Sequence, residues 1–143
     1  MFRMHKTLDV ITLFHTPSIP ASTRIATILK QASARSQEQA TEDQASDQSH
    51  QNSRRDPFEL DITEAPPTKD QLKSIFEYVG GSKAAQLVKG ASSQSDALRK
   101  LQENPDSFLR PVVVDWNQGK AVVGDNESAI LKLLFLFVEL YIV

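Results

Sequence analysis

Residues 110–124 read RPVVVDWNQGKAVVG, in which two apolar runs flank the polar sequence Asn117-Gln118-Gly119. Three consecutive valines are typical of a strand that is buried on both faces. The tripeptide between the runs ends in glycine, as hairpin turns often do. The sequence therefore predicts a β-hairpin whose strands are residues 110–116 and 120–124.

The segment before this hairpin has helical spacing in three places. Residues 68–79 begin with the capping-box pair Thr68 and Gln71, stop at two glycines, and carry apolar side chains at helical intervals, namely Leu72, Ile75, Phe76 and Val79. Shorter helical patterns cover residues 82–89 and 95–103. We expect these helices to cover one face of the sheet.

The N-terminal half predicts two strands with a helix between them. Residues 8–14 (LDVITLF) are typical of a buried strand, and residues 57–63 (PFELDIT) alternate as a half-exposed strand does. Pro20 suits a first helical turn, and residues 21–34 place Ile25, Ile28 and Leu29 on one face. This order predicts a parallel strand-helix-strand unit.

The complete order is strand, helix, strand, helices, hairpin and a last helix that Asn126 can cap. A parallel βαβ unit followed by an antiparallel ββα unit is the arrangement of the thioredoxin fold. The fold class is therefore α/β with a four-stranded mixed sheet, and the length of 143 residues predicts a single domain, residues 1–143.

Composition excludes several kinds of chemistry. The formal charge of −2 argues against a nucleic-acid partner. The chain has no cysteine, which excludes a disulfide, a thiolate metal site and a sulfur nucleophile of its own. Because the sulfur nucleophile is missing, we expect no catalytic residue. The spacing of His, Asp and Glu suggests no metal site, so we also expect no metal ligand.

Residues 36–54 (SQEQATEDQASDQSHQNSR) form a polar insertion within the domain. Only two of them are hydrophobic, and four acids stand against one base. Such a stretch buries too little apolar surface to offset its ordering entropy. We predict a disordered loop or a ragged helix extension that forms no strand and adds nothing to the core.

Four local patterns occur in an order that resembles the arsenate-reductase branch of the thioredoxin-like superfamily. They are His15-Thr16-Pro17 with Arg24, Pro66-Pro67-Thr68, residues 84–89, and Asn104-Pro105 followed by Arg110-Pro111 and residues 121–124. The nucleophilic cysteine of that branch falls at about Ser18 or Ile19. An oxyanion-binding arginine is replaced by Lys89, and an arginine after the last strand is replaced by Asp125.

A second resemblance fits these departures more closely. Asp115-Trp116, residues 121–127 and the polar insertion are similar to a small fungal family of mitochondrial redox proteins with a thioredoxin-like domain. Its members are proposed to reduce small toxic molecules, and some carry a candidate redox cysteine where residues 96–101 lie here. The resemblance implies a mitochondrial oxidoreductase, with glutathione as a candidate co-substrate, although this chain lacks the cysteine.

The resemblance also suggests where a ligand would bind. Arg110 would reach an anion at the first strand-helix loop, which contains Ser18, and Arg24 and Lys89 would complete a cationic pocket. The alternatives are a surface arginine paired with an acid at position 110 and exposed helix charges at the other two. We expect Pro111 to be cis, and His15 to be a structural residue or a proton carrier.

Two readings of function therefore remain open. The first is a redox-family oxidoreductase without its own nucleophile. The second is a catalytically silent module that holds an anion, glutathione or a protein partner at residues 16–24 and Arg110.

The two ends of the sequence add little to this choice. Residues 1–7 are basic but too few for a separate presequence, so the mitochondrial expectation rests on the resemblance. Residues 131–143 (LKLLFLFVELYIV) form an atypical apolar C-terminal helix that is too short to span a bilayer. This helix is either an altered C-terminus or a surface for a partner or a membrane.

Overall fold

Four strands form one sheet in the order β2-β1-β3-β4 in the computed structural model, which describes residues 9–41 and 57–134. β1 (Asp9–Phe14) pairs in parallel with β2 (Phe58–Thr63) and antiparallel with β3 (Val112–Asp115). β3 pairs antiparallel with β4 (Lys120–Val123). This mixed sheet with its flanking helices is a thioredoxin-like fold, which confirms the predicted fold class.

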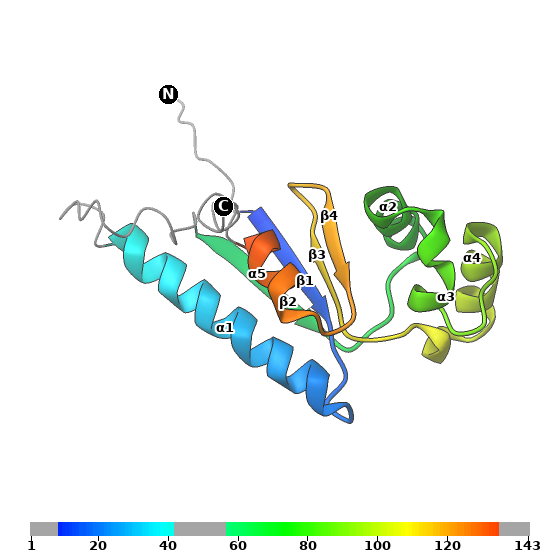
Figure 1. The fold of residues 1–143 in the computed structure, drawn as a ribbon, viewed down its shortest axis with the longest axis horizontal. Coiled ribbons are helices and arrows are strands. Elements are labelled where there is room, and N and C mark those ends of the chain that lie inside the picture. Colours follow the sequence, from blue (N-terminus) through cyan, green and yellow to red (C-terminus); the bar gives the residue numbers. More distant parts are fainter. Residues whose placement is uncertain (1–8, 42–56, 135–143) are drawn as a thin grey trace.

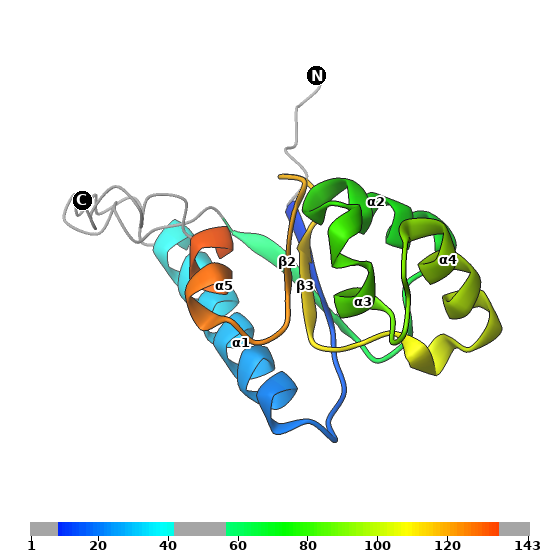
Figure 2. The same ribbon diagram turned by 45° about the vertical axis from the view of Figure 1, so that its right-hand side comes forward.

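Helices cover both faces of the sheet (Figure 1). α1 (Pro20–Thr41) and α5 (Glu127–Leu134) lie on one face, and α2 (Lys69–Val79), α3 (Ala84–Leu87) and α4 (Gln94–Glu103) lie on the other. Figure 2 shows the strands between these two layers. Short 3-10 turns at Gly81–Lys83 and Pro105–Ser107 complete the second layer.

Successive side chains of the central strands point to opposite faces of the sheet and so contribute to two separate hydrophobic cores. Ile11, Leu13 and Val113 face α1 and α5, where they meet Ile25, Leu29 and Ile130. Phe14, Val112 and Val114 face the other layer, where they meet Leu72, Ile75, Leu87 and Phe108. Both faces of β1 and β3 are therefore buried, which explains why the sequences of these two strands are continuous apolar runs.

The β3–β4 turn depends on side chains of the Asp115-Trp116 signature. The buried Asp115 carboxylate accepts hydrogen bonds from the Asn117 and Gln118 amides, both at 3.1 Å. Trp116 Nε1 donates to Thr12 Oγ1 across the sheet at 2.8 Å. These residues therefore have a structural role at the turn end of the sheet.

Several element boundaries differ from the predicted ones. The pattern over residues 82–89 is not one helix, because α3 ends at Leu87 and Val88 forms an isolated antiparallel bridge with Phe108. The strand expected at 110–116 is shortened to Val112–Asp115. The other helices and strands agree with their predicted positions within a few residues, apart from α1.

α1 runs to Thr41 and thus contains the first part of the polar insertion. Helical spacing from Leu29 and Ala32 places Ser36 on the same face, where it is 2% exposed and its hydroxyl donates to Ser33 O at 2.9 Å. Ser36 is therefore buried, although it lies outside both hydrophobic cores, and residues 36–41 form the helix extension that is one of the two predicted alternatives for the start of the insertion. Residues 42–54 lie outside the described residues.

The structure describes only the first four residues of the predicted apolar C-terminal helix, residues 131–143. Residues 131–134 form the last turn of α5, and residues 135–143 lie outside the described part of the chain, as do residues 1–7. Within residues 9–41 and 57–134, no helix combines the length and apolar character needed to cross a membrane.

Candidate functional site

The predicted ligand-binding loop lies at one end of the sheet. Phe14 at the end of β1 pairs with Val112 at the start of β3, so the adjacent residues His15 and Pro111 share this end. The Arg110–Pro111 peptide bond is cis, as expected. Ligands of open α/β sheets commonly bind beyond such strand ends. The register therefore brings the first loop and Pro111 to the same end of the sheet, as the predicted fold requires.

Ser22 organises the first loop, and sequence reasoning missed it. Its side chain is fully buried, and its hydroxyl accepts from the Thr16 amide at 3.0 Å and lies 2.6 Å from His15 Nδ1. The His15 amide also donates to Thr63 O at 2.8 Å. These contacts give His15 a structural partner. The only sequence signal was a polar residue two positions after the helix-starting proline.

Ser18 lies further out in the same loop. It is exposed, and its hydroxyl is 3.1 Å from Thr16 Oγ1. A neutral serine hydroxyl can bind an anion through a hydrogen bond, but it needs an adjacent base to attack a substrate. Ser18 Oγ has no such base among the hydrogen bonds of the described residues.

Arg110 extends from the segment before β3. Its Nη2 donates to Glu64 O at 2.9 Å and its Nη1 to Phe108 O at 3.1 Å. The guanidinium also lies 5.6 Å from the centre of the Phe108 ring, and its buried Nε has no hydrogen-bond partner within the described part of the chain. Arg110 thus joins the β2–α2 connection to the segment before β3.

The charge on Arg110 is only weakly compensated. Burial lowers its pKa, and the carboxylates of Asp106 and Glu64 partly offset that effect. Within the described part of the chain, neither carboxylate nor any other lies within ion-pair distance of it. The alternative in which Arg110 is a salt-bridged surface arginine therefore does not describe its contacts.

Arg24 has a different environment. Its Nη2 lies 3.2 Å from Asp125 Oδ2 and its Nε lies 2.8 Å from Glu127 Oε2. These pairs join the start of α1 to the start of α5. The charge reversal at Asp125 is thus matched by Arg24, and two carboxylates surround this one cation.

Lys89 lies beyond the end of α3 and is exposed. Its amide donates to Ser107 O at 2.9 Å, which ties this segment to the turn before β3. Arg110, Arg24 and Lys89 thus have three distinct sets of neighbours, and Arg110 is the one whose guanidinium is held by uncharged carbonyl groups.

Residues 96–101, where the resemblance places a candidate redox cysteine of other family members, lie in α4. Asp96 at its start accepts from the Ser92 amide at 2.9 Å and pairs with Arg99. The hydrogen bond from Ser92 lowers the pKa of Asp96. Residues 96–101 therefore include a helix-start carboxylate with structural contacts. Across residues 9–41 and 57–134, no group of three His, Asp or Glu side chains could hold a metal ion.

Comparison with known proteins gives one curated relative and several solved structures. The protein named "Putative redox protein fmp46, mitochondrial" from Schizosaccharomyces pombe is 44% identical over 63 residues, which are 44% of this chain and 52% of that protein. The chain thus spans about half the length of this relative.

Two solved structures share the fold. "Putative arsenate reductase from Yersinia pestis" has a TM-score of 0.53 at 23% identity and covers 85% of this chain and 98% of its own. "Arsenate reductase from Vibrio cholerae" has a TM-score of 0.58 at 15% identity and covers 90% of this chain and 100% of its own.

A family model described as "Protein of unknown function (DUF1687)" matches residues 2–125. This match extends from the segment before β1 to the segment between β4 and α5, and it includes the first loop, Arg110 and Pro111. The chain belongs to the DUF1687 family.

Proposed function

We propose that this chain is a mitochondrial redox-family protein that binds a small anion, of the class of glutathione or an oxyanion, and does not itself perform thiol chemistry. The name of the fission-yeast relative supports the redox and mitochondrial parts of the proposal. The absence of cysteine supports the last part, because a mixed-disulfide step needs a thiolate in the chain.

The environment of Arg110 is the observation that carries the anion-binding proposal. A partly buried cation without a counter-ion loses hydration, and neutral hydrogen-bond acceptors compensate for that loss only in part. Main-chain carbonyls satisfy two of the donors of Arg110, while Nε has no partner among the described residues. A carboxylate or oxyanion that approaches this guanidinium would supply the missing negative charge.

The same geometry limits the affinity. Nε is buried, so the guanidinium has to shift before it can offer a two-donor fork. Pro20 removes one amide donor from the first turn of α1. Asp125 and Glu127 both pair with Arg24, so the charge of Arg24 is already compensated and adds little attraction for an anion. We therefore expect dissociation constants of about 1 mM, which corresponds to about 4 kcal/mol of binding free energy.

Calorimetric titration with glutathione and with arsenate at fixed ionic strength tests this proposal. Arg110→Ala should weaken binding at least about tenfold, because it removes the unneutralised cation. Arg99→Ala is the matched control, since it deletes an exposed arginine that is already paired with Asp96 and Glu103. Equal binding by the wild type and Arg110→Ala would overturn the site assignment.

A further inference from the structure

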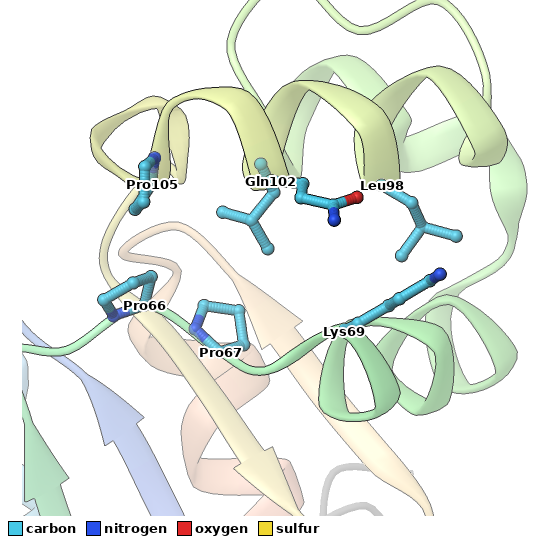
Figure 3. A pocket seen from close by; sticks show the side chains of 7 residues that line it. Pro66, Pro67, Lys69, Leu98, Gln102 and Pro105 are labelled. Atoms are coloured by element: carbon cyan, nitrogen blue, oxygen red, sulfur yellow. The ribbon is translucent and has the colours of Figure 1, made fainter.

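A pocket lies between α2 and α4, and its lining does not include Arg110, Glu64 or Phe108. It has a volume of about 200 Å³. Its apolar lining comes from Pro66, Pro67, Leu98, Leu101 and Pro105. Figure 3 shows Pro66, Pro67 and Lys69 on one side of the pocket and the side chains of Leu98, Gln102 and Pro105 on the other.

Size restricts what this pocket can hold. Pockets for drug-sized ligands usually have volumes of about 300–1,000 Å³, whereas an apolar cavity of about 150 Å³ is enough for benzene. A compact branched or aromatic group therefore fits, and a helix or a large cofactor does not.

Two polar residues line the same pocket. Across the described residues, the Lys69 ammonium and the Gln102 amide have neither a hydrogen-bond partner nor an ion-pair partner. An ammonium group attracts a carboxylate, and a side-chain amide can donate to it as well. The pocket thus combines an apolar lining with a cation and an amide donor.

We propose that this pocket binds a small monocarboxylate whose apolar part is compact and branched or aromatic. The apolar part would contact Leu98, Leu101 and the prolines, while the carboxylate would pair with Lys69. The site does not involve Arg110, so the proposal is independent of the anion-binding function proposed above.

Nuclear magnetic resonance titration with 4-methylpentanoate tests the proposal. Prolines have no amide signal, so the methyl groups of Leu98 and Leu101 are the reporters inside the pocket. We expect these methyl signals to shift with a dissociation constant of about 1 mM, as suits a ligand with so few atoms. Shifts confined to other parts of the protein would overturn the location.

A neutral ligand and two lysine variants test the role of charge. The amide 4-methylpentanamide should bind at least about fivefold more weakly than the acid, and Lys69→Met should weaken the acid by a similar factor. Lys73→Met is the matched control, because Lys73 is an exposed residue one turn later in α2 that does not line the pocket. Equal binding of acid and amide, or equal effects of the two variants, would overturn the carboxylate assignment.

A peptide that ends in leucine carries the same chemistry on a larger molecule. If the peptide N-acetyl-Ala-Ala-Leu with a free carboxylate binds more than tenfold more tightly than 4-methylpentanoate, the occupant is a peptide terminus and the small-molecule assignment is wrong. Binding of the peptide equal to or weaker than that of the free acid supports the proposal.

Discussion

Arg110 shows how far one residue's role can be inferred from sequence. Its place before Pro111 suggested an arginine near the first loop, and the described contacts put its guanidinium on two main-chain carbonyls. The identity of those acceptors depends on the path of the β2–α2 connection in space. A residue pattern carries no direct signal for such a contact, because the acceptors are backbone atoms that every residue has.

We predict that Arg110→Ala lowers the free energy of unfolding by about 1–2 kcal/mol. The substitution removes two hydrogen bonds from a charged donor, and partial exposure of the side chain keeps their contribution near the low end of the usual range. Urea unfolding measures the loss, with Arg99→Ala as the control; an effect no larger than that of the control would contradict the prediction.

Ser22 was not identifiable from the sequence, because a serine near a helix start is usually read as an exposed cap. Its burial follows from its position facing His15 and Thr16.

Ser22→Ala should therefore lower the free energy of unfolding by about 1–3 kcal/mol, since it leaves the partly buried Thr16 amide and His15 Nδ1 without their partner. Ser18→Ala, in the same loop but exposed, should change it by less than about 0.5 kcal/mol. Similar midpoints of urea unfolding for the two variants would show that the Ser22 contact does not stabilise the loop.

At the scale of elements, the spacing of apolar residues predicted helices correctly where the local sequence signals agreed with the packing in the fold. α2 combines a capping box with an apolar face, and the structure contains both features where the sequence predicts them. The pattern over residues 82–89 fails because Val88 pairs with Phe108, a partner twenty residues away. α1 continues beyond residue 34 as the predicted helix extension of the polar insertion, because a polar composition does not prevent a helix when one of its faces still packs.

The ion pairs between the start of α1 and the start of α5 give an element-scale prediction. Asp125→Asn leaves Arg24 with Glu127 alone and removes one negative charge beside the first loop. Because both partners are about half exposed, the free energy of unfolding should change by less than about 1 kcal/mol.

Arsenate binding, in contrast, should become about two- to fivefold tighter in Asp125→Asn, because less negative charge opposes the ligand. Calorimetry at two ionic strengths measures this gain, which should shrink as salt increases. Weaker binding in Asp125→Asn would show that the carboxylate supports the site rather than opposing it.

At the scale of the whole molecule, the sheet was predictable because its two halves carry strong and separate signals. The parallel unit and the hairpin are joined through the β1–β3 pairing, which connects positions 14 and 112. That long-range pairing follows from the rules for connecting strands once each strand is identified. The pocket between α2 and α4 did not follow, because it forms where leucines of α4 meet prolines from two other segments of the chain, and the helical spacing of Leu98 and Leu101 does not show which segments they meet.

The whole chain also sets a limit on chemistry. A thiol-disulfide reaction proceeds through a mixed disulfide, and arsenate reduction by thiols needs a sulfur atom to receive the arsenic and release it in reduced form. None of the 143 residues is a cysteine, and the nearest substitute in the first loop, Ser18, is an exposed hydroxyl without an adjacent base. Binding of an anion can therefore persist in this fold where turnover does not.

We expect the purified chain to show no reduction of arsenate or of a disulfide when glutathione, glutathione reductase and NADPH are supplied. The measured quantity is NADPH consumption at 340 nm above a reaction without the protein, with an authentic arsenate reductase as the positive control. The same preparation should still bind arsenate by calorimetry, because a guanidinium such as that of Arg110 binds an oxyanion without sulfur. Turnover that grows in proportion to the concentration of this chain, and that Arg110→Ala removes, would mean that a group other than a thiol in the protein carries the reaction.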